Sequence, residues 1–385
     1  MALILPIMGA VFASFLLVGI ALPVLPIHLS GDLGFGPFVV GLVTGSQFIA
    51  SVLSRVWAGR LADRRGGKDA ILLGLAVSGL AGLLYLLSLT VLTTPPLSAG
   101  ILLFGRAGIG IAESLVITGA VTWAMSVSGP AHSGRVIAWI GTAMFGAMAL
   151  GAPLGTVIYE ASGFVGISLS TVLISVAVAL AIMPLGYSKP APAKDGRTLF
   201  SVLGGVCVPG VAAALSSLGY GAILAFGTLL FVQNGWTPVW LPFSAYAAAL
   251  IAARLLLGQL PDRLGGARVA AIFVVVEMVG LIMIWAAPGP LVAAAGCVVV
   301  GFGYSLVYPG LGAVAVGRVD AAARGLAMGL YTVFLDIALG FGSVGLGILA
   351  ASSSVSVVFV TTAGMVLCAL PIAVGLTRVS NHSRQ

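Results

Sequence analysis

Twelve long apolar segments decide what this chain can fold into. Each is about as long as the roughly 20 helical residues that cross the hydrocarbon core of a bilayer. None alternates with period two, as strands of a membrane barrel do, so each must satisfy its own backbone hydrogen bonds as a helix. The segments cover residues 4–28, 37–58, 70–92, 98–127, 134–160, 163–186, 201–232, 237–257, 269–287, 291–316, 325–349 and 354–376. We therefore expect an all-α membrane protein with twelve transmembrane helices.

The composition supports this expectation and limits the chemistry. Only 7% of the residues are charged, against about 25% in soluble proteins. The first segment lacks a basic region before it and is too long for a signal peptide, so we interpret it as a retained helix. Cys207, Cys297 and Cys368 lie singly in apolar segments, which is typical of packing residues. We expect no disulfide, metal site or cofactor.

The basic residues follow a topological pattern. Lys and Arg occur in the loops after the even-numbered helices, whereas the opposite loops carry only His28, Asp32 and Glu160. This is the positive-inside rule, and it predicts that both termini are cytoplasmic. The net charge of +7 is then a consequence of topology. We expect a multi-pass protein of a bacterial inner membrane, surrounded by lipid, with no nucleic-acid partner.

Several phrases occur twice, about half the chain apart. The phrase RVWAGRLADRRGG at 55–67 agrees with RLLLGQLPDRLGG at 254–266 in seven of thirteen positions. ESLVITG at 113–119 resembles YSLVYPG at 304–310. Parallel repeats of six helices describe one transporter architecture, with the binding site between the repeats. We predict six-helix bundles at residues 1–186 and 201–385, with a cytoplasmic linker at 187–200.

These phrases carry a family resemblance. GRLADRRGGK at 59–68 resembles the cytoplasmic signature G-x-L-a-D-r-x-G-r-k of the major facilitator superfamily, with Gly67 where that pattern has Arg. The stretches GRAGIGIAESLVITGAVTWAMS, GPAHSGRVIAWIG, LGAPLG and LDIALG are similar to the bacterial YhhS/YfcJ-type group. That resemblance implies efflux of sugars or drugs, and the group is similar to exporters of opine-type metallophores. It also implies a monomer.

The signature predicts a conformational gate. Its glycines permit a tight turn, and the resemblance implies that Asp63 approaches the positive start of helix eleven and latches the outward-facing state. A plain turn with topological charges is the alternative, especially for the second copy. The gating residues would be Gly59, Asp63, Arg64, Gly66 and Lys68 in the first copy, and Gly258, Asp262 and Arg263 in the second.

Four charged residues lie well inside apolar segments, where a charge costs roughly 2.5–3.5 kcal/mol on insertion scales. Arg106 and Glu113 are seven residues apart, so they share one helical face about two turns apart. Arg106 and Gly110 match the R-x-x-x-G signature, which the resemblance associates with proton coupling. Glu113 is then a candidate proton carrier, and a static Arg–Glu pair is the alternative.

The other two buried charges lie on helices eleven and nine. Asp336 shares a polar face with Thr332 and Ser343, and Gln47 belongs to a similar stripe on helix two, which together predict walls of an aqueous cavity. Asp336 would bind a proton or a cationic substrate group, or make a buried hydrogen bond. Glu277 is expected to be a packed or lipid-facing protonated carboxyl. Tyr304 and Tyr308 are candidate lining residues, with Tyr220, Tyr246, Gln233 and Trp123, whereas His28 and His132 are not.

Helix five contains GTAMFGAMALGAPLG at 141–155. Gly151 and Gly155 form a small-residue face for close helix packing, and Pro153 predicts a bend. The segment partly resembles the glycine–proline signature of antiporters, so we interpret it as a kink that serves conformational change. Packing alone is the alternative.

Known catalytic and ATP-binding motifs are absent from the sequence, so we do not expect an enzyme. We predict a secondary active transporter that works by alternating access. The favoured form is a substrate:H+ antiporter that exports a drug, a sugar or an opine-type metallophore. Proton-coupled uptake of a small polar solute by symport is the alternative.

Overall fold

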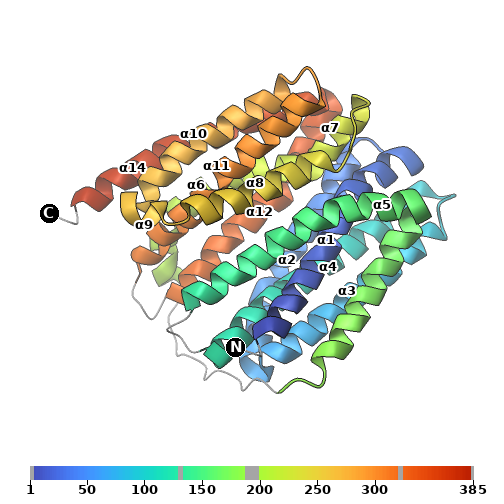
Figure 1. Cartoon of the computed structure of the whole chain (residues 1–385), viewed down its shortest axis with the longest axis horizontal. Coiled ribbons are helices and arrows are strands. Elements are labelled where there is room, and N and C mark those ends of the chain that lie inside the picture. The colour runs from blue at the N-terminus through green and yellow to red at the C-terminus, as the bar shows by residue number, and fades with distance from the viewer. Residues whose placement is uncertain (1–3, 129–132, 187–198, 320–323, 383–385) are drawn as a thin grey trace. The chain divides into compact units, whose positions relative to one another are not determined.

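The computed structural model describes residues 4–128, 133–186, 199–319 and 324–382, and every regular element in these ranges is helical (Figure 1). The first half contains α1 (Ile4–Ile27), η1 (His28–Asp32), α2 (Pro37–Arg65), α3 (Gly67–Leu89), α4 (Pro95–Ser128) and α5 (Ser133–Ile182). The second half contains α6 (Leu199–Ala222), η3 (Ile223–Gly227), α7 (Thr228–Gln233), α8 (Leu241–Leu257), α9 (Leu260–Leu264), α10 (Gly266–Trp285), α11 (Pro290–Gly317), α12 (Arg324–Ser352), α13 (Val355–Leu367) and α14 (Ala369–His382).

The predicted all-α architecture of twelve membrane helices is confirmed. Ten helices in the described ranges are long and apolar enough to cross a membrane. One of them, α5, contains the fifth and sixth predicted helices, joined at Gly163, whose φ of 62° interrupts the helix. The eighth predicted helix is the shorter α8, of 17 residues. The fifth and sixth predicted helices are thus two separate helices that meet at Gly163 (Figure 1).

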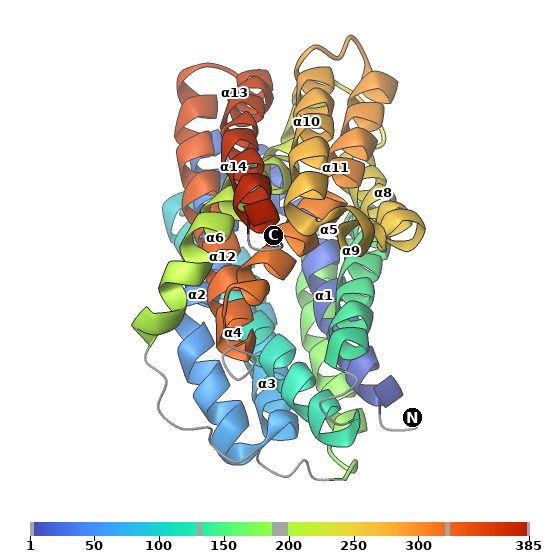
Figure 2. The same ribbon diagram turned by 90° about the vertical axis from the view of Figure 1, so that its left-hand side faces the viewer.

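The chain forms two compact units, residues 1–194 and 195–385, and each has the same packing pattern. In the first unit, α4 packs against α2 and α3, and α5 packs against α1 and α3. In the second, α11 packs against α8 and α10, and α12 packs against α6 (Figure 2). Residues 187–198 of the predicted linker, together with His132, lie outside the described residues.

The first glycine of each repeated Gly-Gly pair ends a helix. Gly66 and Gly265 have φ values of 97° and 89°, a region that side chains rarely adopt. Their N–H groups donate to the carbonyls of Ala62 and Pro261, at 2.9 and 3.0 Å. The same turn is therefore built at the same place in each unit, and glycine is needed there for its backbone conformation.

The second glycine of each pair allows two helices to touch. A Cβ atom at Gly67 would lie closer than 3.0 Å to the carbonyl oxygen of Gly119 on α4, and one at Gly266 equally close to that of Gly310 on α11. Gly119 and Gly310 end the second repeated phrase. An arginine at position 67, as the family signature has it, would collide with α4. The departure from the signature thus has a steric cause.

Candidate functional site

The best-defined polar pair in the first unit joins α2 to α4. Gln47 on α2 donates from Nε2 to Oε2 of the half-buried Glu113 on α4, at 2.7 Å. The helices can approach because Gly110 has no side chain: a Cβ there would overlap the backbone of Gln47. The glycine of the R-x-x-x-G pattern therefore brings the α2 stripe to Glu113, and both predicted site residues meet.

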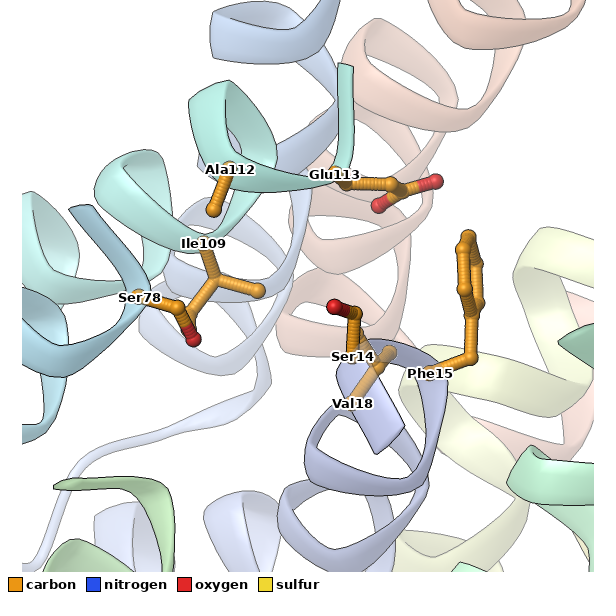
Figure 3. Close-up of a pocket in the computed structure, with 7 residues that line it drawn as sticks. All are labelled: Ser14, Phe15, Val18, Ser78, Ile109, Ala112 and Glu113. Atoms are coloured by element: carbon orange, nitrogen blue, oxygen red, sulfur yellow. The ribbon is translucent and has the colours of Figure 1, made fainter. Parts of the chain in front are cut away.

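Glu113 also borders a small cavity inside this unit. Figure 3 shows the lining side chains, which come from α1, α3 and α4. They are Ser14, Phe15, Val18, Ser78, Ile109, Ala112 and Glu113. The space suits roughly one water molecule. The hydroxyl of Ser14 is buried with no hydrogen-bond partner among the described residues. The carboxyl thus lies between an amide donor and a partly polar cavity.

Arg106 lies two turns before Glu113 on α4, and a static pair of these two residues was the alternative expectation. Its side chain is 1% exposed, and its guanidinium lies close to the hydroxyl of Tyr85 on α3. None of its three nitrogens has a hydrogen-bond partner in the described part of the chain. The structure therefore contains a buried cation without a fixed anion, and the static Arg–Glu pair is not formed.

In the second unit, tyrosines occupy the equivalent positions. Tyr304 and Tyr246 correspond in the repeat to Glu113 and Gln47, and a Cβ at Gly301 would overlap the backbone of Tyr246 just as one at Gly110 would overlap that of Gln47. The ring centroids of Tyr246 and Tyr304 lie 5.4 and 6.0 Å from that of Tyr220. A stacked aromatic cluster thus replaces the acid–amide pair.

Some of the predicted site residues on α11 and α12 contact one another. The hydroxyls of Tyr308 and Thr332 lie 3.2 Å apart, and Tyr331 donates to the carbonyl of Tyr308 at 2.7 Å. Asp336 is buried on α12. Ser343 donates to the carbonyl of Leu339 on its own helix, at 2.6 Å. The hydroxyl of Ser343 is therefore satisfied locally, as serines inside helices often are.

Most charged residues of the gating motif are exposed. Asp63 and Arg64 lie in the last turn of α2, and Asp262 and Arg263 lie in α9. Arg263 donates to Oε1 of Gln259 at 2.9 Å. A Cβ at Gly59 would meet nothing within 4 Å, whereas Gly258 packs against the carbonyl of Arg254.

Lys68 is the exception in the motif. It is 9% exposed, and its Nζ donates to the carbonyls of Met183 and Leu185, at 2.7 and 2.6 Å. These carbonyls follow the end of α5, where a cation is favourable. The second copy has Ala267 at this position. Lys68 therefore ties the repeated phrase to α5 in the first unit only.

The glycines of helix five pack against α1. A Cβ at Gly151 or Gly155 would lie closer than 3.0 Å to the backbone of Gly19 or Ile20. Pro153 lies between them inside α5. Close packing is thus one role of this face, and its role as a moving kink stays a prediction.

One polar cluster was not predicted. The Nδ1 atom of His28 lies 2.6 Å from Oδ2 of Asp32, to which Tyr159 also donates at 2.7 Å. The ring of His28 stacks on Phe164, with centroids 4.2 Å apart. The spacing of four between His28 and Asp32 was visible in the sequence. Tyr159, more than a hundred residues away, was not a foreseeable partner.

Two repeated bundles of membrane helices, each with polar groups buried between its helices, define a polytopic helical carrier. The family model described as Major Facilitator Superfamily matches residues 7–243 and 210–385. The chain belongs to the Major Facilitator Superfamily. It is therefore a multi-pass membrane transporter of small molecules and not an enzyme.

Similar proteins cover nearly the whole chain. An MFS-type transporter of Pseudomonas aeruginosa strain UCBPP-PA14 is 40% identical over 96% of this chain and 92% of its own length. The MFS-type transporter YhhS of Escherichia coli K12 is 39% identical over 93% of this chain and 88% of its own. The predicted YhhS-type resemblance is confirmed.

Solved structures share the fold at low identity. A bacterial homologue of the human lysosomal transporter Spinster has a TM-score of 0.80 at 13% identity, over 97% of this chain and 96% of that one. The xylose transporter XylE of E. coli has a TM-score of 0.76 at 13% identity, over 96% and 94%. These likenesses concern the fold alone.

Proposed function

We propose that this transporter is a proton-coupled exporter that exchanges a small molecule for protons by alternating access. It would act in a bacterial inner membrane, as a monomer in lipid, with both termini in the cytoplasm. One observation carries the proposal: Glu113, a carboxyl on a membrane helix, accepts a hydrogen bond from the amide of Gln47 and borders a cavity. Such a carboxyl can gain or lose a proton when its surroundings change.

The neighbours of Glu113 suggest how that change would occur. The amide of Gln47 stabilises the ionised carboxylate, because it donates a hydrogen bond to it. A substrate group that carries positive charge or donates a hydrogen bond would bind the ionised carboxylate beside the cavity and favour loss of its proton. Arg106, buried on the same helix, would add to this electrostatic pull on the proton. Binding of substrate and binding of a proton would then compete.

The remaining predicted residues have supporting roles in this proposal. Tyr304, Tyr308, Thr332 and Asp336 would contribute to substrate binding with Gln47, and their hydroxyl, aromatic and acidic groups suit a sugar, an amphiphilic drug or an opine-type metallophore. Asp63 would latch the outward-facing state, and the Pro153 region would bend as the units move.

The test is proton movement in everted membrane vesicles that contain the transporter. Respiration acidifies the interior, a pH-sensitive dye reports it, and sugars, an opine-type metallophore and cationic drugs are added in turn. A compound that is exported should dissipate the gradient in wild type and fail to do so in Glu113→Gln. Glu160→Gln, which removes an exposed carboxyl, is the matched control and should behave as wild type.

Two outcomes would overturn export by antiport. Accumulation of a radiolabelled compound in right-side-out vesicles under an inward proton gradient would establish symport instead. Gradient loss that is equal in wild type and Glu113→Gln would remove Glu113 from the coupling mechanism.

A further inference from the structure

Glu277 on α10 is a buried carboxyl that the site above does not use. It is 0% exposed. Ser216 on α6 donates a hydrogen bond to its Oε2, and its Oε1 has no hydrogen-bond partner among the described residues. A fully buried carboxyl with one hydrogen bond is far more stable with its proton attached. Ionisable groups inside membrane helices are costly and usually functional.

The neighbouring helices are shaped around this carboxyl. A Cβ at Gly219 on α6 would lie closer than 3.0 Å to Oε1 of Glu277. A Cβ at Gly303 on α11 would lie equally close to the backbone of Glu277. Both glycines thus leave the space that the acid and its helix occupy. An acid that faced lipid would not require glycine at these two positions of neighbouring helices.

Several hydroxyl groups lie in the same bundle as Glu277. Ser217, next to Ser216, donates to the carbonyl of Ala213 and lies 3.0 Å from the hydroxyl of Tyr304. Tyr308 and Thr332, whose hydroxyls lie 3.2 Å apart, are only half-buried. The interior of this bundle is therefore partly polar around Glu277.

The groups near Glu277 are tyrosines. Tyr246 on α8 and Tyr304 on α11 are the titratable groups that interact electrostatically with Glu277 in the described residues. Arg254 on α8 interacts with these tyrosines and with Tyr308. Helix α13, which also packs on α10, has no ionisable side chain.

We propose that Glu277 is a second proton-binding site, inside the C-terminal bundle. On release, the O–H bond of the carboxylic acid breaks, the proton passes to water that a conformational change admits, and the carboxylate is left at Glu277. Uptake is the reverse step. The part of this proposal that concerns coupling rests on the proposed function, whereas the protonation of Glu277 does not.

Infrared spectroscopy of the purified full-length protein tests the protonation directly, without a transport substrate. At neutral pH the wild type should show a carbonyl band of a buried carboxylic acid that is missing from Glu277→Gln. Thr362→Val, which removes a buried hydroxyl of α13 that bonds only within its own helix, should retain the band. A spectrum of Glu277→Gln that keeps the whole carboxylic-acid signal would overturn the proposal.

Transport assays test the coupling. Glu277→Gln can still accept the hydrogen bond from Ser216, so a structural role predicts wild-type coupling. The proposal predicts that downhill exchange persists while proton-driven accumulation falls about tenfold or more. If Glu277→Gln couples normally while Glu113→Gln does not, this inference is wrong and the proposed function stands. If Glu113→Gln also couples normally, the proposed function fails first.

Discussion

At the scale of single residues, Arg106 is the group whose role can be separated most clearly from stability. A buried cation with no hydrogen-bond partner costs free energy in the folded state. Replacing it with an apolar side chain of similar length is often neutral or stabilising. We therefore expect Arg106 to contribute to transport and not to stability.

We predict that Arg106→Met unfolds at an equal or higher temperature than wild type while its proton-coupled transport is lost. Thermal unfolding in detergent and the vesicle assay measure the two properties on the same preparation. A marked fall in the unfolding temperature would show that Arg106 has a structural partner and would contradict this account.

Sequence analysis identified these buried groups but not their partners. The spacing of seven put Arg106 and Glu113 on one face, but that reasoning reaches only neighbours along one helix. Gln47 was assigned to a polar stripe of its own helix, and nothing in the sequence joined it to Glu113. Glu277 was expected to be a packed or lipid-facing protonated carboxyl, and it is packed. The glycines that surround it come from other helices, so the sequence did not show them as its neighbours.

At the scale of helices, the repeated Gly-Gly phrase connects sequence to packing. The glycines at 67 and 266 each touch a glycine carbonyl on the next long helix. Such contacts leave no space for a methyl group, and overpacked sites cost typically 1–3 kcal/mol.

We predict that Gly67→Ala and Gly266→Ala each lower the free energy of unfolding by about 1–3 kcal/mol. Gly100→Ala on α4 is the control, because a Cβ there would meet nothing within 4 Å and alanine favours a helix. Chemical unfolding in detergent measures all three. Equal stability of Gly67→Ala and Gly100→Ala would contradict the close packing of α3 on α4.

Lys68 is expected to stabilise only the first bundle, because the second copy of the motif has no lysine at this position. Lys68→Met removes two charge-assisted hydrogen bonds to the end of α5, each of which is worth about 1.5–3 kcal/mol at most. We expect lower stability and faster hydrogen exchange at residues 179–186, with no change in α10 or α11. Ala267→Leu is a suitable comparison in the second copy. Unchanged exchange near residue 183 would mean that Lys68 acts as a topological charge alone.

At the scale of the whole molecule, the length and order of the twelve helices followed from the apolar segments, because the bilayer fixes both their length and their backbone bonding. The tight junction of the fifth and sixth helices at Gly163 did not, because a junction at one glycine and a short loop look alike in sequence. The π-helical turns of η1 and η3 likewise have no sequence signal. The three cysteines were expected to be packing residues, but only Cys297 is buried, whereas Cys207 is half-buried and Cys368 is exposed.

The positive-inside pattern makes a direct prediction about topology. After Cys207, Cys297 and Cys368 are replaced by Ala, a single cysteine at Thr93 should react with a membrane-impermeant maleimide added outside intact spheroplasts. A cysteine at Arg64 should react only after the membrane is opened. Both positions are exposed on the protein surface, so the side of the membrane on which each one lies determines the labelling. The reverse labelling pattern would invert the topology.

The central claim is that substrate and proton compete at Glu113, and proton release on binding measures this most directly. Purified transporter is placed in weakly buffered detergent solution with an indicator dye, and the compound found active in vesicles is added. Wild type should release protons in a saturable manner, and Glu113→Gln should bind the same compound with no release. Equal proton release from Glu113→Gln would contradict the account.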